Sequence, residues 1–99
     1  MSTDDITITH RETSNGGEYR ASTGGDEHAG ELTWHQREEG VRVADHTGVP
    51  TSMRGRGIAE KLVRALIDDA RDQGFKIVPA CSYVATQFQR NPEWRDMKA

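Results

Sequence analysis

A short glycine-rich stretch, Arg54-Gly55-Arg56-Gly57-Ile58-Ala59, carries the residue types best suited to binding an anion. Glycines let the backbone curl so that successive N–H groups point at one anion, and they let that anion approach closely. The first turn of a following helix would add unpaired N–H groups and a partial positive charge. Arg54 and Arg56 can add charge-assisted hydrogen bonds, and the small Ala59 leaves room for a bulky ligand. We therefore predict a diphosphate site in this stretch, called the glycine turn below. The alternative is a flexible turn with solvated arginines.

Two familiar glycine loops fit the glycine turn less well. A P-loop requires Lys-Ser or Lys-Thr after its last glycine, and this chain has Ile58-Ala59 there. A dinucleotide-binding fingerprint requires a third glycine, and this chain has Glu60 in its place. Neither a nucleoside triphosphate site nor a dinucleotide site is therefore favoured.

The glycine turn must be positioned by a strand before it and a helix after it, and the sequence predicts both. Apolar residues recur at helical spacing from Ile58 to Ala70, and Gly74 suits the position just past the helix end. Alternating patterns instead predict strands at 6–9, 17–21, 29–36 and 41–49, with glycine-containing turns at 15–17 and 24–26 that can adopt a positive φ. A strand at 75–78, stopped by Pro79, and a short helix from an N-cap at Ser82 to about Arg90 complete the chain.

These elements give the order β-β-β-β-α-β-α, an α/β (α+β) fold class. A helix that crosses between two strands implies that strands 41–49 and 75–78 are parallel neighbours. The remaining pairs are joined by short turns and should be antiparallel. We therefore predict a mixed, mostly antiparallel sheet of about five strands, one long helix and a short C-terminal helix. At 99 residues, the chain is expected to form one domain over residues 1–99.

Composition argues against several classes of partner. A net charge of −3 gives no basic excess for nucleic-acid phosphates. No apolar run reaches the roughly 20 residues of a membrane span, and the acidic start does not resemble a signal peptide. The single cysteine, Cys81, fits a reducing compartment, so we expect a cytoplasmic protein. His10, His28 and His35 show no metal-ligand spacing and are interpreted as surface residues, so no metal is expected.

The spacing Arg54-x-x-Gly57-x-Ala59 resembles the acetyl-CoA motif of the GNAT N-acetyltransferase superfamily, in which Gln or Arg precedes x-x-G-x-G or x-x-G-x-A. Four stretches resemble one branch of short, single-domain members: Thr47 to Pro50, Arg54 to Leu62, Val78 to Val84 and Gln89 to Trp94. Within them, the run Cys81-Ser82-Tyr83-Val84 is the most specific. The resemblance narrows the predicted diphosphate to that of coenzyme A.

This chain differs from the short members of the superfamily, or from the superfamily as a whole, in three respects. Asn91 stands where the branch has His, and Trp94 stands where it has Tyr. The superfamily also has two helices after its first strand that help to bind the acceptor, and residues 6–17 leave no room for them. We therefore expect an acceptor site that is open, or that another protein completes.

The resemblance implies that this chain binds acetyl-CoA as its co-substrate. An amine, whose identity the sequence leaves open, would attack the acetyl thioester directly. By resemblance, the pantetheine lies between residues 47–49 and 77–81, and the backbone N–H of Val49 stabilises the oxyanion. The predicted CoA-binding residues are Val49, Arg54, Gly55, Arg56, Gly57, Ile58 and Ala59.

Three side chains are candidates for catalysis. Cys81 as a thiolate would accept the acetyl group, although we favour a packed, unreactive thiol. Tyr83 is a candidate acid for the leaving thiolate, as in many relatives, or else a core aromatic. His46 is a candidate base, with a plain surface histidine as the preferred interpretation.

The leading hypothesis is therefore N-acetyl transfer to an amine. The first alternative is a GNAT-like CoA-binding sensor or interaction module without transferase activity. An interaction domain without a CoA site ranks last, because the glycine turn and the Cys81-Ser82-Tyr83-Val84 run would then coincide by chance.

Overall fold

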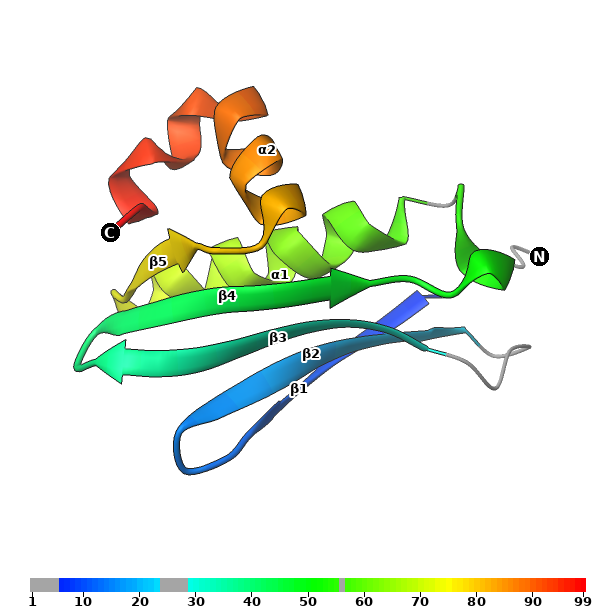
Figure 1. Ribbon diagram of the computed structural model, residues 1–99, viewed down its shortest axis with the longest axis horizontal. Coiled ribbons are helices and arrows are strands. Elements are labelled where there is room, and N and C mark those ends of the chain that lie inside the picture. Colours follow the sequence, from blue (N-terminus) through cyan, green and yellow to red (C-terminus); the bar gives the residue numbers. More distant parts are fainter. Residues whose placement is uncertain (1–5, 24–28, 56) are drawn as a thin grey trace.

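A computed structural model of the chain describes residues 6–23, 29–55 and 57–99, and it confirms the predicted element order. Five strands form one sheet in the order β1-β2-β3-β4-β5, with α1 behind the sheet and α2 beside β5 (Figure 1). Only β4 and β5 are parallel among the strand pairs described. The strands are β1 (Ile6–Glu12), β2 (Gly16–Thr23), β3 (Ala29–Glu38), β4 (Val41–Gly48) and β5 (Lys76–Pro79). The helices are η1 (Thr51–Met53), α1 (Ile58–Gln73), α2 (Ser82–Arg90) and η2 (Pro92–Met97).

The β1–β2 connection corrects one prediction. Gly16 and Gly17 lie within β2, and neither has a positive φ. They are needed because β2 is crowded there. A Cβ on Gly16 would lie 2.4 Å from the Trp34 carbonyl oxygen, and one on Gly17 would lie 2.8 Å from the Trp34 indole ring. The predicted turn at residues 24–26 lies outside the described residues.

The long helix α1 forms as predicted. Its apolar stripe is buried, with Leu62, Val63 and Leu66 fully inaccessible, and it packs against β1, β2 and β3. The helix ends at Gly74, whose φ of 82° is in the left-handed region and whose N–H donates to the Ala70 carbonyl. Burying this stripe fixes the start of α1, and therefore the glycine turn, against the end of β4.

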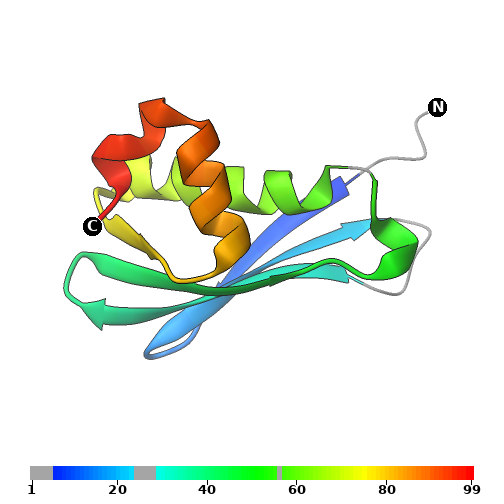
Figure 2. The same ribbon diagram turned by 45° about the horizontal axis from the view of Figure 1, so that its top comes forward.

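The C-terminal segment differs from the prediction at its first residue. Cys81, in an extended conformation, is the N-cap of α2, and Ser82 is the first helical residue. No side chain caps this end; instead the Ala85 N–H donates to the Cys81 carbonyl. After α2, residues 91–99 fold back so that the Ala99 N–H donates to the Ile77 carbonyl along the outer edge of β5 (Figure 2). Trp94, which stands where the branch has Tyr, is buried in this segment.

One interpretation, that of His10 as a surface residue, is wrong. Its imidazole is half-buried, stacks on Tyr19 with 4.0 Å between ring centroids, and accepts a hydrogen bond from Trp34 Nε1 at 3.0 Å. Tyr19 in turn donates to Asp69 of α1 at 2.6 Å. Sequence spacing gave no indication of this group, because its members come from β1, β2, β3 and α1. It joins the edge of the sheet to the long helix.

Candidate functional site

The glycine turn and the start of α2 border one hollow of about 170 Å³. Six of the seven residues predicted to bind CoA line this hollow, together with one predicted catalytic residue. The lining consists of Val49, Met53, Arg54, Gly55, Gly57, Ile58, Ala59, Glu60 and Tyr83. The seventh, Arg56, lies outside the described residues. The fold therefore brings Tyr83 together with residues 49–60, although α1 and β5 separate them in the sequence.

The backbone of the glycine turn requires glycine at two positions. Gly55 has a φ of 85° and Gly57 a φ of 70°, both in the region that side chains disfavour. Gly57 is the N-cap of α1, and the first hydrogen bond of the helix runs from the Lys61 N–H to the Gly57 carbonyl. Among the described residues, no side chain caps this end of α1. The N–H groups of residues 58–60 are therefore the ones available to an anion.

The predicted CoA-binding residues differ in what they offer. The Arg54 Nε donates to the Val49 carbonyl oxygen at 3.3 Å, which holds the exposed guanidinium beside the hollow. Ile58 is only 2% exposed, so its side chain belongs to the core. Only its backbone N–H is therefore available to a ligand. Ala59 is half-buried and lines the hollow. Among the described residues, this arrangement supplies the Arg54 guanidinium and several backbone N–H groups, which are the groups that bind a diphosphate.

Two lining residues were missed by the sequence analysis. Met53 in η1 is completely buried and forms part of the hollow's apolar floor. Glu60, in the first turn of α1, borders the same hollow, and its carboxylate accepts a hydrogen bond from Arg64 Nε at 3.0 Å. An isolated Met gives no signal in the sequence. Glu60 directly follows the glycine turn, but the sequence indicates only that it replaces the third glycine of a dinucleotide-binding fingerprint.

The second part of the site is the point where β4 and β5 separate. The two strands pair from Val41 opposite Lys76 to Ala44 opposite Pro79, and there the parallel ladder ends. The Cys81 N–H donates to the Ala44 carbonyl at 2.9 Å, which turns the chain away from β4 and into α2. Beyond Ala44, β4 is paired with β3 alone within the described part of the sheet. The predicted gap between the ends of these strands is therefore bordered by Thr47 and Cys81.

The Cys81 thiol faces β4. It donates to the Thr47 hydroxyl oxygen, with 3.6 Å between Sγ and Oγ1. Burial alone would raise the pKa of this thiol, but hydrogen bonds from the Val84 backbone and from Thr47 lower the pKa below its ordinary value. Cys81 is half-buried and packs against the core, and it is not among the residues that line the hollow at the glycine turn.

Tyr83 is the catalytic candidate that does line the hollow. Its ring is partly buried against the core. Burial, followed by the nearby Glu60 carboxylate, raises the pKa of the Tyr83 hydroxyl, and Arg90 opposes this effect. The hydroxyl therefore keeps its proton at neutral pH and is able to act as a proton donor.

His46 lies elsewhere. It is exposed on β4, opposite Thr33 of β3, and its ring lies close to Gly48. Among the described residues, no group of three or more His, Cys, Asp or Glu side chains is placed to hold a metal ion. None of the described helices is long and apolar enough to cross a membrane.

Comparisons with known proteins identify the family and the fold of this chain. Residues 18–97 match the family model of the GCN5-related N-acetyl-transferase. The chain is 38% identical to Protein NATD1 of Gallus gallus over 55 residues, which are 54% of this chain and 50% of that protein. Protein NATD1 of Homo sapiens is also 38% identical over 55 residues, which are 54% of this chain and 49% of that protein. The chain thus spans about half the length of the curated relatives that it matches.

A solved structure extends the likeness to the whole chain. The solution structure of a GCN5-like protein of Staphylococcus aureus superimposes with a TM-score of 0.69 and 26% sequence identity. The superposition covers 100% of this chain and 91% of that chain. It confirms the predicted GNAT fold. With the family match over residues 18–97, it shows that the chain belongs to the GCN5-related N-acetyltransferase family.

Proposed function

We propose that this chain is an N-acetyltransferase that binds acetyl-CoA and transfers its acetyl group to an amine by direct attack. The observation that carries the proposal is the single hollow in which the glycine turn, Val49 and Tyr83 meet. The start of a helix can bind the diphosphate of a CoA thioester, and a protonated tyrosine beside it can give a proton to the leaving sulfur. Family membership supports the same reaction class.

The residues of the hollow divide the binding task. The backbone N–H groups of residues 58–60 and the Arg54 guanidinium would hold the diphosphate. The N–H of Val49 makes no backbone hydrogen bond to another described residue, which leaves it available as an oxyanion donor. Acetyl-CoA, when bound, supplies the activated acetyl thioester.

The proton donor in this proposal is Tyr83. When the carbon–sulfur bond breaks, the departing sulfur takes the proton of the Tyr83 hydroxyl, and water later restores it. A tyrosine already carries its proton at neutral pH, and the raised pKa of Tyr83 keeps it protonated. Cys81 stays a packed thiol, because its Sγ is engaged with Thr47 and it does not line the hollow.

The binding test compares the two glycines that flank α1, which share one backbone conformation. Gly57 and Gly74 both have left-handed φ values, 70° and 82°, and an added Cβ would meet no atom within 4 Å at either position. Gly57→Val and Gly74→Val should therefore lose similar stability. Only Gly57→Val should weaken the binding of acetyl-CoA and of CoA, by at least about tenfold, as measured by calorimetry.

A second variant covers the case in which Gly57→Val does not fold. Ala59→Glu places a carboxylate in the first turn of α1, where a negative charge is favourable to the helix but unfavourable to a bound diphosphate. It should keep its thermal stability and lose the stabilisation that acetyl-CoA gives the unchanged chain. Unchanged affinity in either folded variant would refute the diphosphate site.

Activity is tested by thiol release from acetyl-CoA with a panel of amines. Release with at least one amine is expected, and mass spectrometry should find no acetyl adduct on Cys81. Binding without release from any amine would instead favour the alternative, a CoA-binding sensor or interaction module. A stable adduct on Cys81 would replace direct attack with a covalent route.

The remaining expectations belong to the same proposal. We expect one domain over residues 1–99, no resident metal, a cytoplasmic location, and no nucleic-acid or membrane partner. The acceptor amine is expected to reach the site through an open surface, because the superfamily's two helices after the first strand have no counterpart between β1 and β2.

A further inference from the structure

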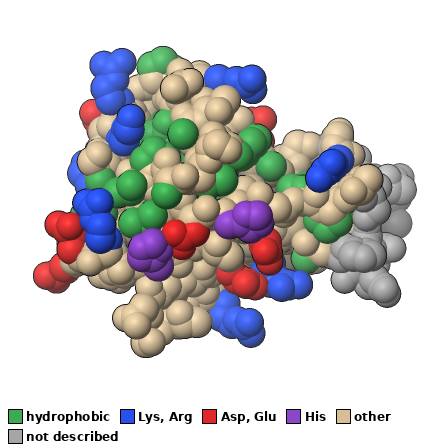
Figure 3. All heavy atoms as spheres, in the orientation of Figure 1, with side chains coloured by type: hydrophobic (Ala, Val, Ile, Leu, Met, Phe, Trp, Pro, Cys, Tyr) green, Lys and Arg blue, Asp and Glu red, His purple; other side chains and the backbone are tan. Residues whose placement is uncertain are grey.

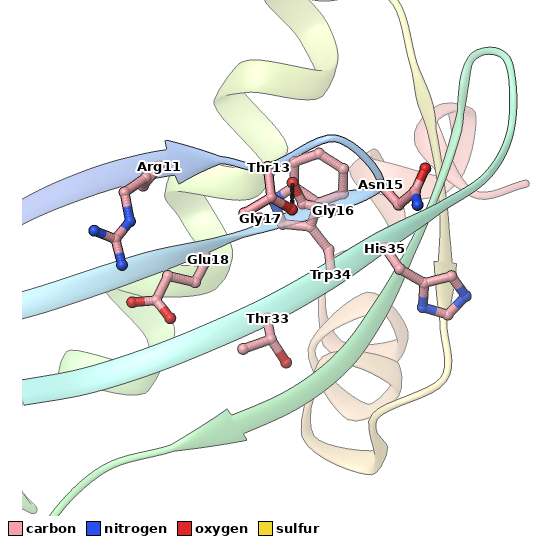
Figure 4. A pocket seen from close by; sticks show the side chains of 9 residues that line it. All are labelled: Arg11, Thr13, Asn15, Gly16, Gly17, Glu18, Thr33, Trp34 and His35. Carbon is pink, nitrogen blue, oxygen red and sulfur yellow. Dashed lines mark hydrogen bonds between the residues drawn. The ribbon is translucent and has the colours of Figure 1, made fainter.

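Two hollows away from the glycine turn differ in the charges that line them. The larger, of about 340 Å³, is lined by residues of β1, β2 and β3 and of the turn that joins β1 to β2. In Figure 4, Arg11 and Glu18 stand at one end of it and His35 stands at the other. Asp45, the extra residue of a β-bulge in β4, lies 2.8 Å from His35 Nδ1. Both ends therefore combine a basic side chain with a carboxylate, and this hollow favours neither sign of charge.

The second hollow, of about 260 Å³, lies between β5, α2 and residues 91–99. We call it the C-terminal hollow. Figure 1 shows these three parts of the chain as an arch beyond the β5 edge of the sheet. The arch is closed by backbone contacts, because Lys98 forms a β-bridge with Ile77 and the Ala99 N–H donates to the Ile77 carbonyl. The C-terminal hollow is therefore a fixed part of the fold.

The inner part of the C-terminal hollow is apolar. Pro79 at the end of β5 and Phe88 of α2 contribute to it, and Phe88 is only 8% exposed. Ala85 and Pro92 complete this apolar lining. In Figure 3, hydrophobic side chains gather over β5 and α2, with Lys and Arg side chains around them. A ligand with an apolar body would gain free energy by removing this surface from water.

The polar part of the lining carries two cations. Arg95 and Lys98 are exposed and stand beside the Gln89 amide. Neither cation forms an ion pair within the described part of the chain. Glu93 and Asp96 belong to the same segment but do not line the hollow. The C-terminal hollow therefore presents positive charge beside an apolar surface.

This combination suits a carboxylate on a compact apolar body. The planar fork of Arg95 matches the two oxygens of a carboxylate, and the Lys98 ammonium adds a point charge. The Gln89 amide supplies further N–H donors. A volume of about 260 Å³ corresponds to about nine water molecules at roughly 30 Å³ each, so the ligand is about the size of a single ring with one carboxylate.

The C-terminal hollow is separate from the proposed CoA site. No residue is shared by the two linings, although α2 contributes to both. Tyr83 faces the glycine turn, and Ala85 faces the C-terminal hollow. Two residues along an α-helix correspond to a rotation of about 200°, so these side chains lie on opposite sides of α2.

We infer that the C-terminal hollow is a second ligand site, which binds a small carboxylate with a compact apolar body. Arg95 binds the carboxylate, Lys98 adds to the attraction, and the body covers Pro79 and Phe88. The inference does not depend on acetyl transfer, because the residues that carry it lie outside the hollow at the glycine turn.

The first experiment titrates the full chain with benzoate and follows ¹H–¹⁵N spectra. Saturable shifts are expected among residues 85–98, with little change at residues 57–60. Benzamide preserves the ring without the charge, and acetate preserves the charge without the ring. Each should bind at least about tenfold more weakly than benzoate, because each loses one half of the recognition.

The second experiment repeats the titration with variants. Arg95→Gln should weaken benzoate binding by at least about tenfold. Arg20→Gln is the matched control, because Arg20 is also an exposed cation but lies on β2, near the other edge of the sheet. It should bind benzoate as the unchanged chain does. Ala85→Leu keeps both cations and fills the hollow with a good helix former, so it should stay folded and lose saturable binding.

The outcomes separate this site from the proposed function. Unsaturable shifts would refute the site, and equal affinity for benzamide or in Arg95→Gln would refute recognition of the carboxylate. Displacement of benzoate by CoA, or shifts centred on the glycine turn, would show that there is no separate site. A chain that binds benzoate as described but does not bind acetyl-CoA would support this inference and refute the proposed function alone.

Discussion

The half-buried His10 makes the stability of this fold depend on pH. Its Nε2 accepts the Trp34 indole N–H at 3.0 Å, a hydrogen bond that only a neutral imidazole can accept there. Burial lowers the pKa of His10; the Asp69 and Glu12 carboxylates oppose this, and Arg42 adds to it. The attraction to Asp69 is limited because that carboxylate is 3.6 Å away, a third exposed, and already accepts the Tyr19 hydroxyl.

The sign and size of the effect follow from proton linkage. Because the pKa of His10 is lower in the folded state, the unfolded chain binds the additional proton first as the pH falls. Stability is therefore fully present above the unfolded pKa of about 6.5, and it is lost as the pH falls toward the folded pKa. The slope cannot exceed about 1.4 kcal/mol per pH unit for one group. Lowering the pH from 6.5 to 5.5 should thus remove up to about 1 kcal/mol, or about 4–8 °C in Tm for a domain of this size.

The assay is urea denaturation followed by tryptophan fluorescence at pH 7.5, 6.5 and 5.5. The comparison is with His10→Phe, which preserves an aromatic ring on Tyr19 but cannot be protonated. This variant should be less stable at pH 7.5, because the Trp34 N–H loses its acceptor, and it should lack the His10 part of the slope. His46→Gln, an exposed control, should keep the full slope. Identical slopes for the unchanged chain and His10→Phe would refute the reasoning.

Three further substitutions test the core, the stacking of Arg42 on two aromatic rings, and the site. Leu66→Ala, at a fully buried position of α1, should lower the free energy of unfolding by about 2–5 kcal/mol in denaturant titrations, and a loss below about 1 kcal/mol would contradict the packing described. Arg42 lies between the Trp34 and Phe75 rings, 4.0 Å from each centroid, so Arg42→Lys should cost about 1 kcal/mol by the same assay; a neutral result would show that the stacking does not stabilise the fold. Tyr83→Phe should reduce kcat about 10²-fold with little change in acetyl-CoA affinity, and an unaffected kcat would exclude it as the proton donor.

Much of the fold follows from local patterns in the sequence. The recurrence of apolar residues from Ile58 to Ala70 determined α1, because a helix must bury one continuous stripe. Gly74 determined its end, because only glycine adopts the left-handed conformation without strain. Alternation determined the strands, and the β-α-β order determined the parallel pair. These features depend on neighbours a few residues apart, which the sequence displays directly.

The position of the glycine turn between a predicted strand and a predicted helix was enough to identify it in the sequence. The residues that share its hollow could not be identified in the same way. Tyr83 lies beside Gly57 only because α1 and β5 return the chain to the end of β4. Met53 contributes to the hollow without any distinguishing spacing. The residue types at the site were therefore visible in the sequence, whereas their shared surface depends on how α1 packs on the sheet.

The histidines show most clearly what only the tertiary structure decided. All of them looked like surface residues in the sequence, yet His10 is half-buried against Tyr19 and Trp34, whereas His35 is exposed and paired with Asp45. The difference arises from strand register and from the bulge at Asp45, which set the face that each side chain occupies. Register is a relation between strands that lie apart in the chain, so no local pattern of residues encodes it.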